Sequence, residues 1–219
     1  MTAIATPNTI PVTSAAAPTV ALKRRTIDSV LIGVGAVLTV VLFVAGGLLM
    51  WGSNFAEDYV YDELSSQNIA FAPAAALEEE GRTDLVQYAD EQVDTGKEAE
   101  AYASFIDGHL ANVAGGQTYA DLGAPERAAN TAVEEAKASN APADEVAALE
   151  ADAAAITGQR NTLFKGETLR GLLLSAFAWS TVGRIAGIAA WAAFAAGAVM
   201  VVLVLFGFRH HHKVVVADK

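Results

Sequence analysis

The stretch "WSTVGRIAGIAAW", residues 179–191, lies within an apolar run from Gly171 to Phe208 whose only charged residue is Arg184. As a helix, these 38 residues would measure about 57 Å at ~1.5 Å per residue. The hydrocarbon core of a bilayer is only ~30 Å thick. A continuous helix over this run must therefore tilt steeply or extend out of the membrane, and the place of Arg184 decides the architecture.

A second apolar block lies near the start of the sequence. Residues 29–51 contain no charge over 23 residues, and residues 185–208 contain none over 24. Both exceed the ~18 residues that indicate a membrane-spanning helix. The first block is also longer than the ~7–15-residue apolar core of a signal peptide, and no A-x-A cleavage site follows it. We expect it to be a retained span, with Trp51 as an interfacial anchor.

The charge distribution predicts how the chain is oriented. Residues 52–184 hold 23 Asp and Glu against 8 Lys and Arg. Basic residues lie beyond the other ends of the two apolar blocks: Lys23, Arg24, Arg25, Arg209 and Lys213. Because basic residues that flank spans prefer the cytoplasm, we expect a protein of the plasma (inner) membrane with both termini in the cytoplasm. The acidic segment would then lie on the extracytoplasmic side. The chain has no cysteine, so an outer domain must be stabilised by packing alone.

The predicted fold is all-α, with two transmembrane helices and an extracytoplasmic helical bundle inserted between them. The predicted parts are a disordered cytoplasmic tail (1–26), the first span (27–51), the acidic outer domain (52–184), the second span (185–208) and a basic cytoplasmic tail (209–219).

Helical periodicity also predicts the elements of the outer domain. We expect the first span to continue as a helix past residue 51 and to be broken within "FAPAAALEEEGRT". Apolar or small residues at steps of three or four predict one helix over 84–114, ending at Gly115 and Gly116. Two further helices are predicted over 125–138 and 142–157, each starting at a proline. No alternation is long enough for a sheet.

Arg184 has two interpretations. As an intramembrane cation it would mark an ion or substrate path. As an interfacial residue it would cap the second span and reach the headgroups. The second interpretation is favoured, because residues 185–208 already reach about 36 Å at ~1.5 Å per residue.

Small residues predict a close helix contact in the membrane. The candidate packing face consists of Ala186, Ala190, Ala193 and Gly197 on the second span, with Gly33, Gly46 and Gly47 on the first, which also offers Gly35. Such a face allows two backbones to approach closely. The contact could be between the two spans of one chain, with another membrane protein or with a second copy, and these are not exclusive.

The sequence carries no recognisable catalytic, cofactor or metal motif. In "RHHHK", residues 209–213, consecutive histidines on a helix project ~100° apart and cannot converge on one ion. We expect this segment to bind anionic lipid. The acidic runs lack a calcium-loop pattern and exclude a nucleic-acid-binding domain. We therefore predict no catalytic residue, no cofactor, no metal and no nucleic-acid partner.

Three stretches resemble one family. They are "LLMWGSNFAEDYVYDELSSQNIAFAP", "YADEQVDTGKEAEAYASFIDGHLANVAGGQTYADL" and "TLFKGETLRGLLLSAFAWSTVGRIAGIAAW". Over about 30–122 and 158–208 the chain resembles actinobacterial two-span membrane proteins that are often catalogued as "aromatic ring-opening dioxygenase". The resemblance implies an envelope protein with an outer helical domain. The catalogued reaction needs iron held by two histidines and a carboxylate. The predicted outer domain has only His109, so we expect no enzyme.

These features favour a non-catalytic accessory or structural subunit that packs against other membrane proteins. The alternative is a sensor whose outer domain binds a ligand. Cytoplasmic segments of about 26 and 11 residues leave no room for an output domain. Such a sensor would need a separate signalling partner.

Overall fold

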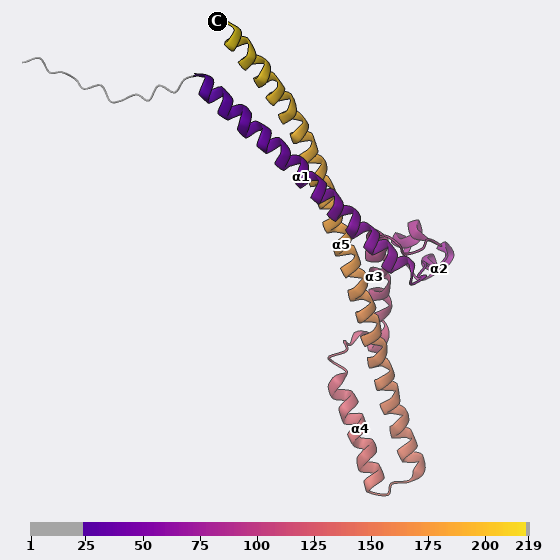
Figure 1. Cartoon of the computed structure of the whole chain (residues 1–219). Coiled ribbons are helices and arrows are strands. Elements are labelled where there is room, and N and C mark those ends of the chain that lie inside the picture. Colours follow the sequence, from indigo (N-terminus) through magenta and orange to yellow (C-terminus); the bar gives the residue numbers. More distant parts are fainter. Residues whose placement is uncertain (1–23, 218–219) are drawn as a thin grey trace, which may run out of the picture. The chain divides into compact units, whose positions relative to one another are not determined.

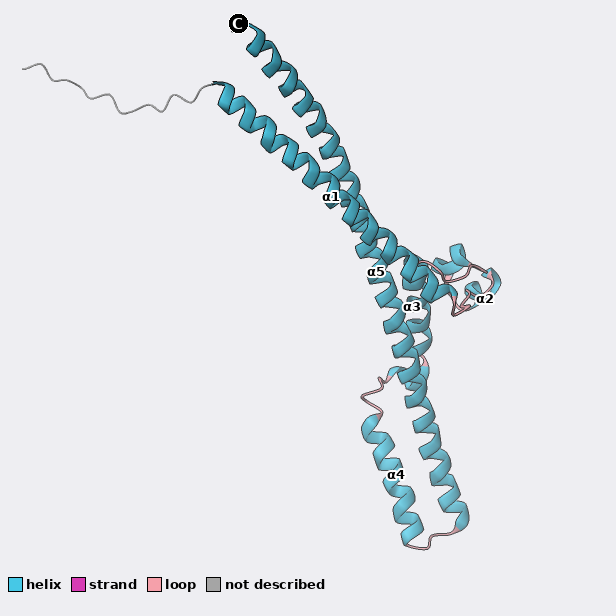
Figure 2. Cartoon of the chain, viewed as in Figure 1, coloured by secondary structure: helices cyan, strands magenta, loops and turns pink. Residues whose placement is uncertain are grey.

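The computed structural model describes the backbone of residues 24–217 and the side chains of residues 26–212. Over these residues the chain is helical, with no strand and a single isolated bridge between Ala70 and Gln92 (Figure 2). The elements in chain order are α1 (Arg24–Ser65), α2 (Ala74–Glu79), the 3-10 helix η1 (Thr83–Tyr88), α3 (Gly96–Leu110), the 3-10 helix η2 (Val113–Gly116), α4 (Gly123–Ala138) and α5 (Ala143–Ala217). The predicted all-α class is confirmed.

Helices α1 and α5 are both long and apolar enough to cross a membrane. In each, only 11% of the most apolar 18-residue window is buried. The core helix of a soluble protein would bury most of such a window, because water-exposed apolar surface is unfavourable at roughly 25 cal/mol per Å². The exposed side chains are instead those expected to face lipid.

By its internal contacts the chain forms two units. The larger unit is Val44–Phe194. The smaller unit combines the described parts of Met1–Phe43 and Ala195–Lys219.

The larger unit has a hydrophobic core built where α1, α3 and α5 meet the short elements between them. Its buried members are Val60, Leu64, Phe71, Leu77, Leu85, Tyr88, Val93, Ala99, Ala103 and Leu173. Phe71 is central to its aromatic part: its ring stacks on Tyr88 at 5.2 Å and meets the edge of Tyr102 at 5.2 Å. A second, smaller cluster consists of Leu110, Leu122 and Leu163.

The predicted single helix over 84–114 is wrong. Its first part forms η1 and an extended segment, and α3 begins only at Gly96. Thr95 accepts a hydrogen bond from the Glu98 N–H, and the Glu98 carboxylate accepts one from the Thr95 N–H, which together form a capping box. Asp90 has a positive φ of 62°, which a continuous helix excludes.

The C-terminal limit of that prediction is also wrong. Helix α3 ends at Leu110, and η2 follows with Ala114 and Gly115 in the left-handed region. Two positive-φ residues in sequence cannot continue a right-handed helix, which is why the helix stops before the glycine pair.

The helix predicted over 125–138 is confirmed as α4, whereas the one predicted over 142–157 does not end there. Its start at Ala143 follows Pro142, but α5 runs on unbroken to Ala217. No proline occurs after Pro142, and α5 keeps its backbone hydrogen bonds through the apolar run. In Figure 1, α4 lies beside the first part of α5, where Lys137 pairs with Glu150 at 2.7 Å.

Candidate functional site

In the larger unit, α1 and α5 touch through small residues. A Cβ on Gly183 would lie 3.0 Å from the Ala56 Cβ and 3.3 Å from the Ser53 carbonyl oxygen. A Cβ on Gly187 would lie 2.8 Å from the Ser53 hydroxyl oxygen. Ser53 and Ala56 are buried. Only glycine permits this backbone approach, so Gly183 and Gly187 define the centre of the contact.

In the smaller unit, the same two helices pack glycine against larger side chains. Gly35 faces Val204, with 2.9 Å between a Cβ on Gly35 and the Val204 Cγ2. Gly197 faces Phe43, and a Cβ on Gly197 would lie 3.1 Å from the nearest carbon of the Phe43 ring. The contact therefore has a small residue on one helix opposite a bulky residue on the other.

The residues of the predicted packing face differ in their burial. Ala190, Gly46 and Gly197 are buried, and a Cβ on Gly46 would lie 2.7 Å from the Phe194 ring. Ala186 and Ala193 are only partly buried.

Gly33 and Gly47 do not belong to this face. Both are exposed, and a Cβ on either would meet no other described atom within 4 Å. Gly35, a further small residue of the first span, is buried, whereas Gly183 and Gly187 were not predicted from the sequence. A signal was available, since 183, 187, 190 and 197 follow each other at steps of three, four or seven.

The predicted interface anchors lie at exposed positions where the structure describes them. Arg184, Trp51 and Arg209 have exposed side chains. Gly183, next to Arg184, packs beside Ala56, and Glu57 is the first charged residue of α1 after Asp28. The charge-free stretches of α1 and α5, 29–56 and 185–208, are thus bounded at the same level by Glu57 and Arg184. Lys23 lies outside the described residues, and for Arg24, Arg25 and Lys213 only the helical backbone is described.

An aromatic ladder continues from Trp51 along α1. The Trp51 ring stacks on Phe55 with centroids 5.8 Å apart, and Phe55 stacks on Tyr59 at 6.3 Å. The three side chains are 68%, 57% and 50% exposed. They lie at i, i+4 and i+8, on one helix face.

At the end of this ladder, α1 and α5 enclose an apolar groove of about 290 Å³. Its floor is made by Val60, Leu64 and Leu173, all at least 93% buried. Its rim is made by Tyr59, Leu172 and Trp179, each at least half exposed. The polar lining residues are Glu63, Gln67 and Ser175. A concave apolar site with few polar groups is the usual form of a ligand pocket.

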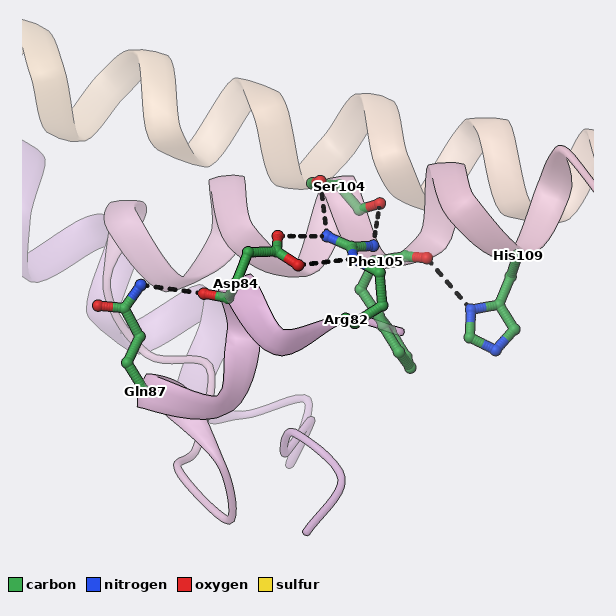
Figure 3. A network of polar contacts seen from close by, with 6 residues as sticks. All are labelled: Arg82, Asp84, Gln87, Ser104, Phe105 and His109. Atoms are coloured by element: carbon green, nitrogen blue, oxygen red, sulfur yellow. Dashed lines mark hydrogen bonds and ion pairs between the residues drawn. The ribbon is translucent and has the colours of Figure 1, made fainter. Parts of the chain in front are cut away.

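A second group of polar residues connects the segment after α2 to α3 (Figure 3). The Arg82 guanidinium donates to both Asp84 carboxylate oxygens, at 3.1 and 2.9 Å, and to the carbonyl and hydroxyl oxygens of Ser104, at 2.9 and 3.0 Å. The hydrogen bond from Arg82 lowers the pKa of Asp84. Because the guanidinium donors are engaged in these bonds, Arg82 acts as a structural clamp.

His109 lies beside this network without completing a metal site. Its Nδ1 donates to the Phe105 carbonyl oxygen at 3.1 Å (Figure 3). Its Nε2 lies 3.6 Å from a Glu80 carboxylate oxygen. Within the part of the chain that the structure describes, no group of three or more His, Cys, Asp or Glu side chains could hold a metal ion.

A third group joins the start of α4 to α5. Arg160 forms an ion pair with Glu126, and its guanidinium lies 4.1 Å from the centre of the Tyr119 ring. The Arg160 hydrogen bond lowers the pKa of Glu126, and a second bond from Thr157 adds to the shift. The Arg160 cluster fastens α4 and its preceding loop to α5.

Comparisons with models of known protein families, with curated proteins and with solved structures found no match to this chain. The resemblance described above therefore stays a prediction.

Proposed function

We propose that this chain is a non-catalytic, two-span protein of the cell envelope that serves as an accessory or structural subunit of a membrane protein assembly. Both termini are cytoplasmic in this proposal, and residues 52–184 form an extracytoplasmic helical domain. Glu57 and Arg184 bound the two charge-free stretches at one level, which supports a membrane boundary there.

The observation that carries the proposal is apolar surface left exposed at and beyond this boundary. On α1, Phe55 is 57% exposed, and on α5, Val182 is 56% exposed, although Gly183 beside it is buried. Large exposed apolar patches on a soluble surface mark interaction sites. Inside the bilayer lipid covers such side chains, whereas at its edge a neighbouring protein covers them better.

The polar clusters of the larger unit support a structural role. Arg82 and Arg160 each join two segments of the chain, through Asp84 and Ser104 in one case and Glu126 in the other. Charged groups that are paired within the fold stabilise its geometry and are not available to a substrate. Near the boundary, exposed apolar side chains such as Phe55 and Val182 lie among the charged ones, which suits packing against a partner.

Purification in mild detergent tests the proposal. We expect the full-length chain to be recovered in a stoichiometric complex with another membrane protein. Phe55→Ser should weaken that complex while the chain still inserts. Phe164→Ser is the matched control, because Phe164 is equally exposed, at 56%, but lies on α5 some 20 residues before Arg184. Recovery only as a monomer, or only as a self-associated form, would refute an accessory role.

A further inference from the structure

We propose that the groove between α1 and α5 binds one acyl chain of a membrane lipid, drawn from the outer leaflet into the extracytoplasmic domain. This goes beyond the proposed function and does not depend on a protein partner. The groove begins just beyond the level of Glu57 and Arg184, at Tyr59, two residues after Glu57, and at Trp179, five residues before Arg184. On α5 the groove extends from Trp179 back to Leu169, ten residues toward the N-terminus of the helix, which is about 15 Å at ~1.5 Å per residue.

The shape of the groove suits a narrow hydrocarbon chain. The volume of about 290 Å³ is small for an inserted helix, and the groove runs along the two antiparallel helices. Its floor of Val60, Leu64 and Leu173 offers no hydrogen-bonding side chain to the occupant. An acyl chain loses no hydrogen bonds on entering such a site, and it keeps the ~0.8 kcal/mol per CH₂ by which an apolar environment is favoured over water.

The path into the groove identifies a membrane lipid as the occupant. The stacked rings of Trp51, Phe55 and Tyr59 form an exposed track from the predicted membrane boundary to the groove rim. On α5, Val182 provides exposed apolar surface between Arg184 and Trp179. A chain can therefore reach the groove from the bilayer while staying in contact with apolar side chains along both helices.

Quenching of tryptophan fluorescence by brominated lipid tests this proposal directly. The chain has three tryptophans, so Trp51→Phe with Trp191→Phe leaves Trp179 as the only reporter. The full chain is reconstituted in phosphatidylcholine vesicles whose acyl chains carry bromine near the methyl end. Those bromines sit near the bilayer centre, far from Trp179, unless a chain occupies the groove. We expect loss of Trp179 emission.

Two variants on α5 separate the groove from general membrane contact. Leu172→Glu places a charge on the groove rim, at a side chain that is 65% exposed and so tolerates replacement. It should restore the Trp179 emission. Leu174→Glu is the control, because Leu174 is an exposed leucine of the same helix that does not line the groove. It should leave the quenching unchanged.

Three results would overturn the proposal. The first is quenching of a Trp191-only protein, whose reporter lies within the predicted span, with no quenching of Trp179. The second is stronger quenching of Trp179 by bromine near the ester carbonyl, unaffected by Leu172→Glu, which would place this residue at the bilayer surface. The third is a Trp179 emission that responds to protein density and not to bromine, which would assign the groove to a second copy.

Discussion

Gly96→Ala should loosen the attachment of α3 to α5. Gly96 is the first residue of α3 and is buried against α5. A Cβ at this position would lie 2.3 Å from the Ser180 Cβ, 2.7 Å from its hydroxyl oxygen and 3.3 Å from the Phe177 Cα. Carbon atoms in contact prefer about 3.5–4.0 Å. The two helices must therefore separate locally by about 1 Å to accept the methyl group.

The magnitude follows from two opposing effects. Overpacking of this kind costs typically ~1–3 kcal/mol. Replacing glycine by alanine in a helix gains at most ~1 kcal/mol, and less at the first residue of the helix. We expect a net loss of roughly 1–2 kcal/mol in the free energy of unfolding. Gly171→Ala is the matched control in α5: a Cβ there meets nothing within 4 Å, so this variant should be stabilised by ~0.5–1 kcal/mol.

Thermal unfolding in detergent and hydrogen exchange of the α3 amides measure the effect. For a chain of this size, 1 kcal/mol shifts Tm by roughly 2–4 °C. Ser180→Gly removes the atom that the new methyl group strikes, so the double variant with Gly96→Ala should recover part of the loss despite the added helix glycine. Equal stability of Gly96→Ala and Gly171→Ala, or strictly additive effects of Gly96→Ala and Ser180→Gly, would refute the packing argument.

Three other perturbations test separate parts of the structure. Thr95→Ala removes the N-cap of α3 and should cost ~1 kcal/mol, seen as faster hydrogen exchange in its first turn; unchanged exchange would contradict the capping role. Glu126→Gln should lower Tm at neutral pH, because Arg160 holds the pKa of this carboxylate below its ordinary value. Such a contribution is present above the unfolded pKa and is lost as the pH falls through the folded pKa, so the variant and the parent should converge in acid. Cysteines introduced at Ser139 and Ser14 should differ toward an impermeant thiol reagent in intact cells, with only the first labelled; the opposite pattern would show that the orientation is inverted.

The two long apolar helices could be predicted from composition, because a charge-free run of about 20 residues is rare outside membrane-spanning helices. Two charge-free runs, residues 29–51 and 185–208, are sufficient to indicate two spanning helices, and both lie in long helices of the structure. The absence of proline after Pro142 allows an unbroken α5, although the end predicted at residue 157 was wrong. These features depend on local chemistry that the sequence carries directly.

Helical periodicity was a less reliable guide to secondary structure in the segment between the two apolar runs. Leu85, Tyr88 and Val93 are buried, but they reach the core from a 3-10 turn and an extended segment instead of one helix. Burial requires that a side chain point inward, and several backbone conformations achieve this at similar spacing. The capping box at Thr95, which marks the true start of α3, was the local signal to the contrary.

Which small residues make contact, and what lies beside them, was decided by the tertiary structure. Gly183 and Gly187 meet α1, whereas Gly33 and Gly47 face outward, because the relative rotation and register of two helices depend on all their side chains together. The groove at Trp179 has the same origin, since its two walls are about 110 residues apart in the chain. The sequence by itself determined two apolar helices and the acidic segment between them; only their packing brought Tyr59 to Trp179, because contacts between distant segments leave no local periodicity.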